Sequence, residues 1–213
     1  MLDVFSGSQS MRAAFLKAGF NVLSIDKYKK YRTDKQTVII DLMDWNYFDF
    51  ERTDFDVLFF GLPCTAFSKA SGGKHFTRLK EPKTKEAIDS LILLQRCFDI
   101  TDYFYNAIFY IENPAGGLES FDIIKNKIFT DNIFYSSFYQ KMYGGPTPKH
   151  TILLHNNRTL NLFTPYYRKK GVINDVSLSD LTITKRQKYP AQMCEMITNW
   201  TMAEIKRKVE FDI

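Results

Sequence analysis

The residue best suited to chemistry is a cysteine that follows a short apolar run. Val57-Leu-Phe-Phe60 has the composition of a buried strand, and it leads through Gly61 and Pro63 to Cys64. We expect Gly61, which lacks a Cβ, to let the backbone turn sharply at this point. A thiolate just beyond a strand can act as a nucleophile, and a nearby positive charge or helix amino terminus would lower its pKa. The alternative is a buried, unreactive cysteine, the usual state of this residue.

Polar side chains also stand at the ends of three other apolar runs. Asp26 follows the run at 20–25, Asp41 follows the run at 36–40, and Glu112 and Asn113 follow the run at 107–111. Pro114 disfavours helical backbone at Asn113, so the carboxylate and the amide should be displayed where the strand ends. In open α/β sheets, ligands bind at the carboxyl ends of parallel strands. The pattern therefore predicts one site that these strand ends share.

The first forty residues have the order strand, turn, helix and strand that such a site needs. Met1–Phe5 reads as a strand, Ser6–Ser10 as a turn of small residues, and Met11–Lys17 as an amphipathic helix closed by Gly19. In a nucleotide-binding unit, amides at the helix start hold the polar part of a cofactor and an acid such as Asp26 accepts ribose hydroxyls. Only one glycine of the dinucleotide pattern is present, so an ordinary turn with a surface acid is the alternative.

Two long helices complete the predicted layers, and a loop separates the first of them from Cys64. The loop 68–80 holds glycines and basic residues, so it should be mobile and suited to closing over an anionic substrate, or else simply solvated. The helix 84–107 is expected to bury one face, with Cys97 in the core; that face comprises Ile88, Leu91, Ile92, Gln95 and Phe98. The helix 190–209 should bury Met193, Ile197, Trp200 and Ile205, with Cys194 structural. Alternating strands and helices predict a mostly parallel, doubly wound α/β sheet.

Composition limits the protein class. With 213 residues, 45% of them hydrophobic, the chain can bury one good core, so we expect a single domain over 1–213. Three widely spaced cysteines argue against a disulfide scaffold or a zinc site and for a reducing, cytoplasmic location. We find no signal peptide and no apolar stretch long enough to span a membrane. A net charge of +5 permits a polyanionic partner without requiring one.

Four motifs, in this order and at these spacings, resemble one family. They are Asp3-Val-Phe-Ser-Gly7, Gly61-Leu-Pro-Cys-Thr-Ala-Phe-Ser68, Glu112-Asn-Pro114 and Tyr143-Gly-Gly-Pro146. Together they are similar to the cytosine-5 DNA methyltransferase family over residues 1–155, and the similarity resumes weakly at 189–196. The resemblance implies a Rossmann-like fold that binds S-adenosylmethionine, with an antiparallel last strand that 151–155 would supply. It also implies DNA as the partner and no metal.

The resemblance assigns roles residue by residue. Cys64 would add to carbon 6 of cytosine, and Glu112, if burial keeps it partly protonated, would hydrogen-bond ring nitrogen 3. Lys149 would keep one positive contact. The implied cofactor-binding residues are Phe5, Ser6, Gly7, Asp26, Asp41 and Leu62. The implied substrate-binding residues are Pro63, Ser68, Lys74, Asn113 and Arg168. Because the base must leave the duplex to reach such a site, base flipping is implied, and the loop 68–80 is a candidate to fill the gap.

The chain also departs from the family pattern. The family's glycines after the first motif fall on Gln9 and Ser10, which puts cofactor affinity in question. Its glutamine and two arginines after the Tyr-Gly turn fall on Thr147, Lys149 and Thr151, and a lysine cannot reproduce the planar fork of an arginine. The alternative for Lys149 is an ordinary basic strand edge beside His150.

A short segment stands where the family carries a large target recognition domain. We expect 156–189 to be a small insertion, in which Phe163–Gly171, containing Arg168, either contacts nucleic acid or forms a surface loop. A short recognition sequence, or specificity supplied by a protein partner or a second subunit, would follow. The leading expectation is a DNA cytosine-5 methyltransferase, of the kind found in restriction-modification systems or phage. The alternatives are an RNA cytosine-5 methyltransferase, or a degenerate homologue that binds nucleic acid or regulates without turnover.

Overall fold

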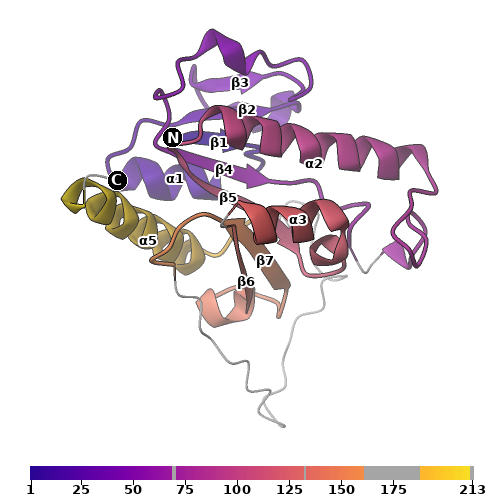
Figure 1. The fold of residues 1–213 in the computed structure, drawn as a ribbon. Helices are drawn as coiled ribbons and strands as arrows, with labels where there is room; N and C mark the ends of the chain where they lie inside the picture. Colours follow the sequence, from indigo (N-terminus) through magenta and orange to yellow (C-terminus); the bar gives the residue numbers. More distant parts are fainter. Residues whose placement is uncertain (69–70, 132, 161–187, 212–213) are drawn as a thin grey trace.

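The computed structural model describes residues 1–68, 71–131, 133–160 and 188–211, and it contains one seven-stranded sheet (Figure 1). The strand order is β3-β2-β1-β4-β5-β7-β6. The strands are β1 (Leu2–Val4), β2 (Leu23–Asp26), β3 (Thr37–Ile39), β4 (Val57–Gly61), β5 (Ile108–Pro114), β6 (Phe134–Tyr139) and β7 (His150–His155). Pairing is parallel from β3 to β5, whereas β7 is antiparallel to both β5 and β6. The predicted parallel sheet with one antiparallel strand is confirmed.

Helices cover both faces of the sheet, as expected for a doubly wound fold (Figure 1). The α-helices are α1 (Ser10–Lys17), α2 (Lys85–Tyr103), α3 (Asp122–Thr130) and α5 (Ala191–Glu210). The short 3₁₀ helices are η1 (Lys29–Tyr31), η2 (Tyr47–Asp49), η4 (Leu118–Ser120) and η5 (Gln140–Tyr143). Among the described residues, none of these helices combines the length and the apolar character that crossing a membrane requires.

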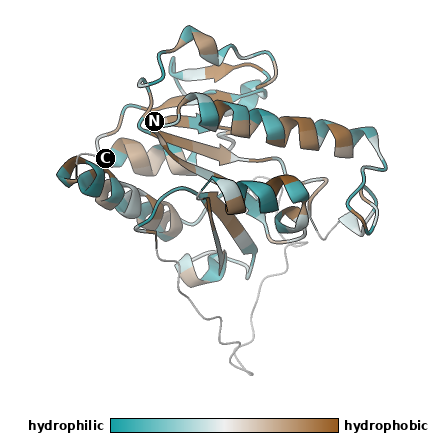
Figure 2. Ribbon diagram, viewed as in Figure 1, coloured by the Kyte–Doolittle hydropathy of each residue, from teal (hydrophilic) through white to brown (hydrophobic). Residues whose placement is uncertain are grey.

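Alternate residues of β4 face two separate hydrophobic clusters. Leu58 and Phe60 belong to the cluster that contains side chains of α2 and α3, whereas Val57 and Phe59 belong to the cluster that contains side chains of α1 and α5. This follows from the two-residue period of a strand, which points successive side chains to opposite faces. Both faces are covered, so β4 is hydrophobic throughout, and Figure 2 shows the central strands in brown.

The buried face of α2 differs from the predicted one. Ile88 and Ile92 are exposed, and the helix instead buries Ala87, Leu94, Cys97, Phe98, Ile100 and Thr101. The prediction of Cys97 and Phe98 as core residues is confirmed. The apolar residues of α2 extend most of the way round the helix, so periodicity alone did not fix which side meets the sheet.

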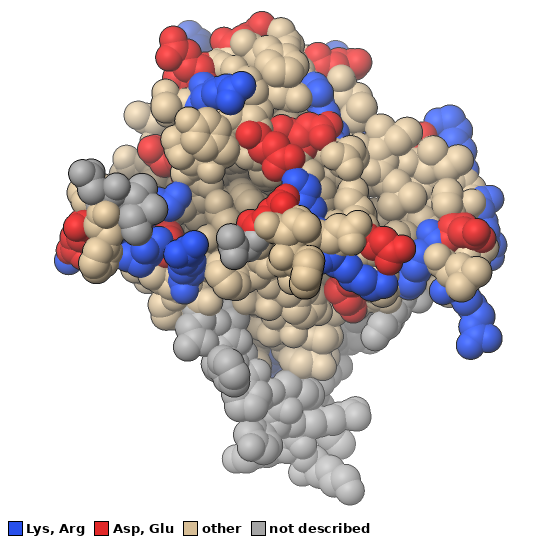
Figure 3. Space-filling model, viewed as in Figure 1, with Lys and Arg blue, Asp and Glu red and all other residues tan. Residues whose placement is uncertain are grey.

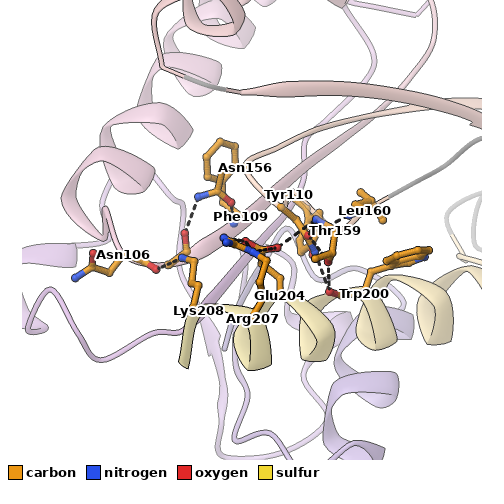
Figure 4. Close-up of polar contacts among 12 residues, drawn as sticks. Asn106, Phe109, Tyr110, Asn156, Thr159, Leu160, Trp200, Glu204, Arg207 and Lys208 are labelled. Atoms are coloured by element: carbon orange, nitrogen blue, oxygen red, sulfur yellow. Dashed lines mark hydrogen bonds and ion pairs between the residues drawn. The ribbon is translucent and has the colours of Figure 1, made fainter. Parts of the chain in front are cut away.

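Polar contacts attach the last helix to β5 and to the chain after β7 (Figure 4). The hydroxyl of Tyr110 on β5 lies 2.8 Å from that of Thr201 on α5 and accepts a hydrogen bond from Asn157 at 2.7 Å. Glu204, also on α5, is 1% exposed; it accepts a hydrogen bond from the amide of Thr159 and forms an ion pair with Arg207. Because each of these buried groups has a partner, the network can hold α5 in one place on the sheet.

Candidate active site

The strand register brings the ends of β1, β4 and β5 to one level of the sheet. Val4 pairs with Phe60, and Phe60 pairs with Ile111. One residue further on, Gly61 pairs with Glu112, and Phe5 follows Val4 at the same level. The expected meeting of strand ends at one sheet edge is therefore what the backbone shows.

The turn between β1 and α1 is held by Asp26 at the end of β2. The backbone amide of Gly7 donates to Oδ2 of Asp26 at 2.9 Å, and the amide of Tyr28 donates to Oδ1 at 2.9 Å. Gly7 has a φ of +46°, in the left-handed region that glycine adopts without strain. Asp26 is 6% exposed, and each of its oxygens keeps further acceptor capacity.

Gln9 occupies the position where the family pattern has a glycine, and it adopts a backbone that glycine favours. Its φ is +57°, which is uncommon for a residue with a side chain. The side chain offsets that cost, because its amide nitrogen donates to the carbonyl of Tyr31 at 2.6 Å and its oxygen accepts from the hydroxyl of Thr33 at 2.7 Å. The turn is thus built without the missing glycine.

Cys64 lies in a loop that is tied to β5. The side-chain amide of Asn113 donates to the carbonyl of Leu62 at 3.0 Å, and both residues are buried. The carbonyl of Cys64 accepts backbone hydrogen bonds from Phe67 and from Ser68. These bonds fix the loop that presents the Cys64 thiol, which is half-buried.

The surroundings of Cys64 act on its thiol in opposite directions. Burial raises the pKa of Cys64 above its ordinary value, Glu112 raises it further, and Lys149 lowers it. The positive charge of Lys149 acts in the expected downward sense, but the net direction is upward. The reason is that desolvation of the thiolate outweighs the attraction of Lys149.

Glu112 is 3% exposed and has a partner at each carboxylate oxygen. Lys149, just before β7, places Nζ 3.4 Å from Oε1, and the hydroxyl of Tyr189, just before α5, donates to Oε2 at 2.8 Å. The carboxylate therefore lies between two side chains that arrive from distant parts of the chain. Sequence reasoning named Lys149 but missed Tyr189, although the residue opens the 189–196 segment in which the resemblance resumes.

Gly61 has a role other than the sharp turn that we expected. It ends β4 without entering the left-handed region. A Cβ at this position would lie 2.9 Å from the hydroxyl oxygen of Tyr189 and 3.3 Å from the carbonyl oxygen of Phe5. The missing Cβ leaves room for Tyr189 to reach Glu112.

The remaining predicted residues are placed as follows. Ser6 is buried, and its hydroxyl has no hydrogen-bond partner among the described residues. Asp41 is half-buried and accepts a hydrogen bond from the backbone amide of Met43. The side chains of Pro63 and Lys74 are exposed, and that of Ser68 is half-buried. Arg168, and most of the predicted insertion 156–189, lie outside the described residues.

A cavity adjoins the Cys64 loop. Its volume is about 250 Å³, and its lining includes Phe67, Ser68, Phe76, Lys80 and Gly117. The side chain of Lys80 reaches the ring of Phe121, with Nζ 5.4 Å from the ring centre. On the face drawn in Figure 3, basic and acidic residues are interspersed over the described surface.

Residues 1–116 match the family model described as C-5 cytosine-specific DNA methylase. No curated protein matches the sequence. Among solved structures, the chain is similar to the Dnmt2 methyltransferase of S. pombe, with a TM-score of 0.52, 16% identity, and coverage of 81% of this chain and 57% of that one. It is also similar to the methyltransferase EhMeth of Entamoeba histolytica, with a TM-score of 0.51, 17% identity, and coverage of 75% and 53%.

A third similar structure is an E. coli prophage protein described as a DNA modification methyltransferase. Its TM-score is 0.50, with 20% identity and coverage of 72% of this chain and 45% of that one. At these identities the likeness shows a shared fold. This chain spans about half the length of the three structures.

Proposed function

The chain belongs to the C-5 cytosine-specific DNA methylase family, and on that premise we propose that it methylates carbon 5 of cytosine in DNA through a covalent adduct with Cys64. The observation that supports this most directly is the meeting of two groups at one level of the sheet. The loop after Gly61 presents the Cys64 thiol, and the residue paired with Gly61 is Glu112. A nucleophile and a carboxyl group that can bind the same ring are the two parts that the reaction requires.

The residues divide the chemistry between them. Cys64, as thiolate, adds to carbon 6 of the ring and makes carbon 5 electron-rich enough to accept a methyl group. Glu112, in its protonated form, donates a hydrogen bond to ring nitrogen 3 and so stabilises the negative charge that develops on addition. After methylation, carbon 5 gives up its proton to water. The electron pair of that bond forms the double bond between carbons 5 and 6, which breaks the bond to sulfur and expels Cys64 as thiolate. When Glu112 is ionised, Lys149 lies close enough to balance the charge of its carboxylate.

S-adenosylmethionine, when bound, supplies the electrophilic methyl group. The turn after β1 fits such a cofactor, because the buried hydroxyl of Ser6 and Oδ2 of Asp3 have no hydrogen-bond partner among the described residues. We propose that Phe5, Ser6 and Gly7 line its site, that Asp26 accepts the ribose hydroxyls, and that Asp41 and Leu62 complete it. The chain's three cysteines are free, which suits a reducing, cytoplasmic setting for the Cys64 thiol.

Substrate contacts are proposed for the residues around the thiol. Pro63, Ser68 and Asn113 would shape the pocket for the flipped base, and Lys74 and Arg168 would meet phosphates. Sequence specificity would come from the segment 156–189 or from a protein partner or second subunit.

The deciding experiment is covalent trapping on 5-fluorocytosine. Fluorine does not leave as a proton does, so a DNA oligonucleotide carrying this base should form a stable adduct with the wild-type protein when S-adenosylmethionine is present. Cys64→Ser should form none, whereas the matched control Cys194→Ala, at a buried cysteine on α5, should react like wild type.

Parallel trapping on RNA of matched sequence decides the substrate class. An adduct on RNA alone would replace DNA with RNA in the proposal. Absence of both adducts, with S-adenosylmethionine shown to bind by calorimetry, would refute the catalytic proposal and favour a homologue that binds without turnover.

A further inference from the structure

Tyr189 contacts two residues of the candidate active site and one core residue of β4. Its hydroxyl donates to Oε2 of Glu112 at 2.8 Å. Its ring meets Phe59 edge-on at 5.8 Å, and Nζ of Lys149 lies 5.9 Å from the ring centre. Tyr189 therefore packs on the sheet next to Gly61 and closes one side of the Glu112 carboxylate.

The fit between Tyr189 and Gly61 is specific to the hydroxyl. A Cβ at Gly61 would lie 2.9 Å from the hydroxyl oxygen but 4.0 Å from the ring carbon that carries it. The first distance is a clash and the second an ordinary contact. The backbone of Gly61 lies outside the left-handed region, so the space for this hydroxyl is a reason for glycine at this position.

The carboxyl group of Glu112 is held at both of its oxygens, each by a different side chain. Lys149 holds Oε1 and Tyr189 holds Oε2, so rotation of the group would break at least one contact. Each carboxylate oxygen has two lone pairs, which leaves capacity for a substrate on either side. The buried hydroxyl of Thr151, where the family pattern has an arginine, interacts instead with Gln140.

The hydroxyl of Tyr189 remains a donor over the working pH range. Burial raises the pKa of Tyr189 well above its ordinary value, and the neighbouring charge of Glu112 adds to the rise. The phenol therefore keeps its proton and can offer it only as a hydrogen bond.

We propose that Tyr189 is a positioning residue that fixes Glu112 against ring nitrogen 3 of the target pyrimidine. This inference rests on the proposed function, because it needs Glu112 to contact that ring. It adds a determinant of the site that comes from the segment preceding α5, 77 residues from Glu112.

The first test is a double-mutant cycle on binding affinity, in which one change is made in the protein and the other at nitrogen 3 of the target base. DNA duplexes carrying cytosine or 3-deazacytosine, in which a CH group replaces nitrogen 3, are titrated with protein and S-adenosylhomocysteine. Wild type should bind the 3-deaza duplex up to about tenfold more weakly, because it loses the hydrogen bond that protonated Glu112 donates to nitrogen 3. In Tyr189→Phe this ratio should fall below about threefold, because a loosely held Glu112 gains less from nitrogen 3.

Tyr110→Phe is the matched control. It removes a buried hydroxyl from the same face of the sheet, outside the candidate site, and should leave the ratio at the wild-type value. An unchanged ratio in Tyr189→Phe would overturn the positioning role alone. Equal binding of both duplexes by wild type would overturn the contact of Glu112 with the ring, and the positioning role with it.

A second cycle tests the geometry without any substrate. Gly61→Ala should lower the thermal unfolding midpoint of wild type by about 2 to 8 °C, as expected for roughly 1 to 2 kcal/mol of overpacking. In the Tyr189→Phe background the loss should be less than half as large, because only the contact with the carbonyl of Phe5 remains tight. Equal losses in both backgrounds would show that the hydroxyl does not lie beside Gly61, and would overturn the proposal.

Discussion

Replacing Asp3 by asparagine should change how the stability of the protein depends on pH. Asp3 lies on β1 and is 2% exposed, and its Oδ2 has no hydrogen-bond partner among the described residues. Burial raises the pKa of this carboxyl to about 7, and the nearby Arg12 only partly opposes the rise. The folded protein therefore holds a proton on Asp3 at pH values where the unfolded chain has released it.

The sign and size of the effect follow from linkage. Between the unfolded pKa of 3.8 and the folded pKa of about 7, the folded state binds more protons, so stability falls as pH rises. At about 1.4 kcal/mol per pH unit, the loss attributable to Asp3 reaches about 4 kcal/mol. Asparagine does not titrate, so the stability of Asp3→Asn relative to wild type should increase as the pH rises from 3.8 to about 7, and the difference should persist above pH 7.

His155 produces the opposite slope. It is 1% exposed, and burial lowers its pKa from 6.5 to about 4. Between these values the unfolded chain binds the extra proton, so stability rises with pH by about 3 kcal/mol in total. The two slopes nearly cancel in wild type. Asp3→Asn should therefore show stability that rises from pH 4 to pH 6.5, and His155→Gln should show stability that falls.

Urea unfolding followed by circular dichroism at pH 4, 5, 6, 7 and 8 would measure these slopes. Asp44→Asn, at an exposed aspartate, is the control for the change in side-chain chemistry and should differ little from wild type at any pH. A difference between Asp3→Asn and wild type that stays constant across the range would refute the reasoning, because it would mean that Asp3 does not take up a proton on folding.

Three further predictions concern the candidate site. Lys149→Met should lower the free energy of unfolding in urea by about 3 kcal/mol, because the buried carboxylate of Glu112 loses its cation. Adding Glu112→Gln to this variant should recover part of the loss. If the effects of the two substitutions simply add, the two side chains do not form a pair. The rate at which iodoacetamide modifies Cys64, followed by mass spectrometry, should increase as the pH rises. At a given pH, Lys149→Met should react more slowly than wild type and Glu112→Gln should react faster. A rate independent of pH would rule out the raised pKa of the thiol. Asp26→Ala should weaken S-adenosylmethionine binding by about tenfold in calorimetry, because the Gly7 turn loses its acceptor, and unchanged affinity would remove Asp26 from the cofactor site.

The strands and most helices could be predicted because their patterns are local. The apolar run at 57–60 and the acids that follow the early strands indicate a parallel sheet without any knowledge of contacts. By contrast, β6 and α3 were missed. The exposed residues of β6 lie at the sheet edge, and this strand forms only by pairing with β7, a partner that no local pattern reveals.

Part of the candidate site could be predicted for the same reason. Cys64, Glu112 and Asp26 each lie in or just beyond the carboxyl-terminal part of a strand, so the topology of a parallel sheet brings them to the same edge. The left-handed Gln9 could not be foreseen, since its backbone is stabilised by bonds to Tyr31 and Thr33. Nor could the direction of the Cys64 pKa, which depends on how deeply the thiol is buried relative to its distance from Lys149.

Apart from β6 and α3, the sequence by itself determined the order of strands and α-helices, the family, and which residues have the chemistry to act. Only the tertiary structure decided that Tyr189 reaches Glu112 and that Gly61 lacks a Cβ to admit its hydroxyl. The physical reason is range. Hydrophobic periodicity and turn chemistry act over a few residues and can be read along the chain, whereas a hydrogen bond between positions 112 and 189 exists only after the sheet and α5 have packed.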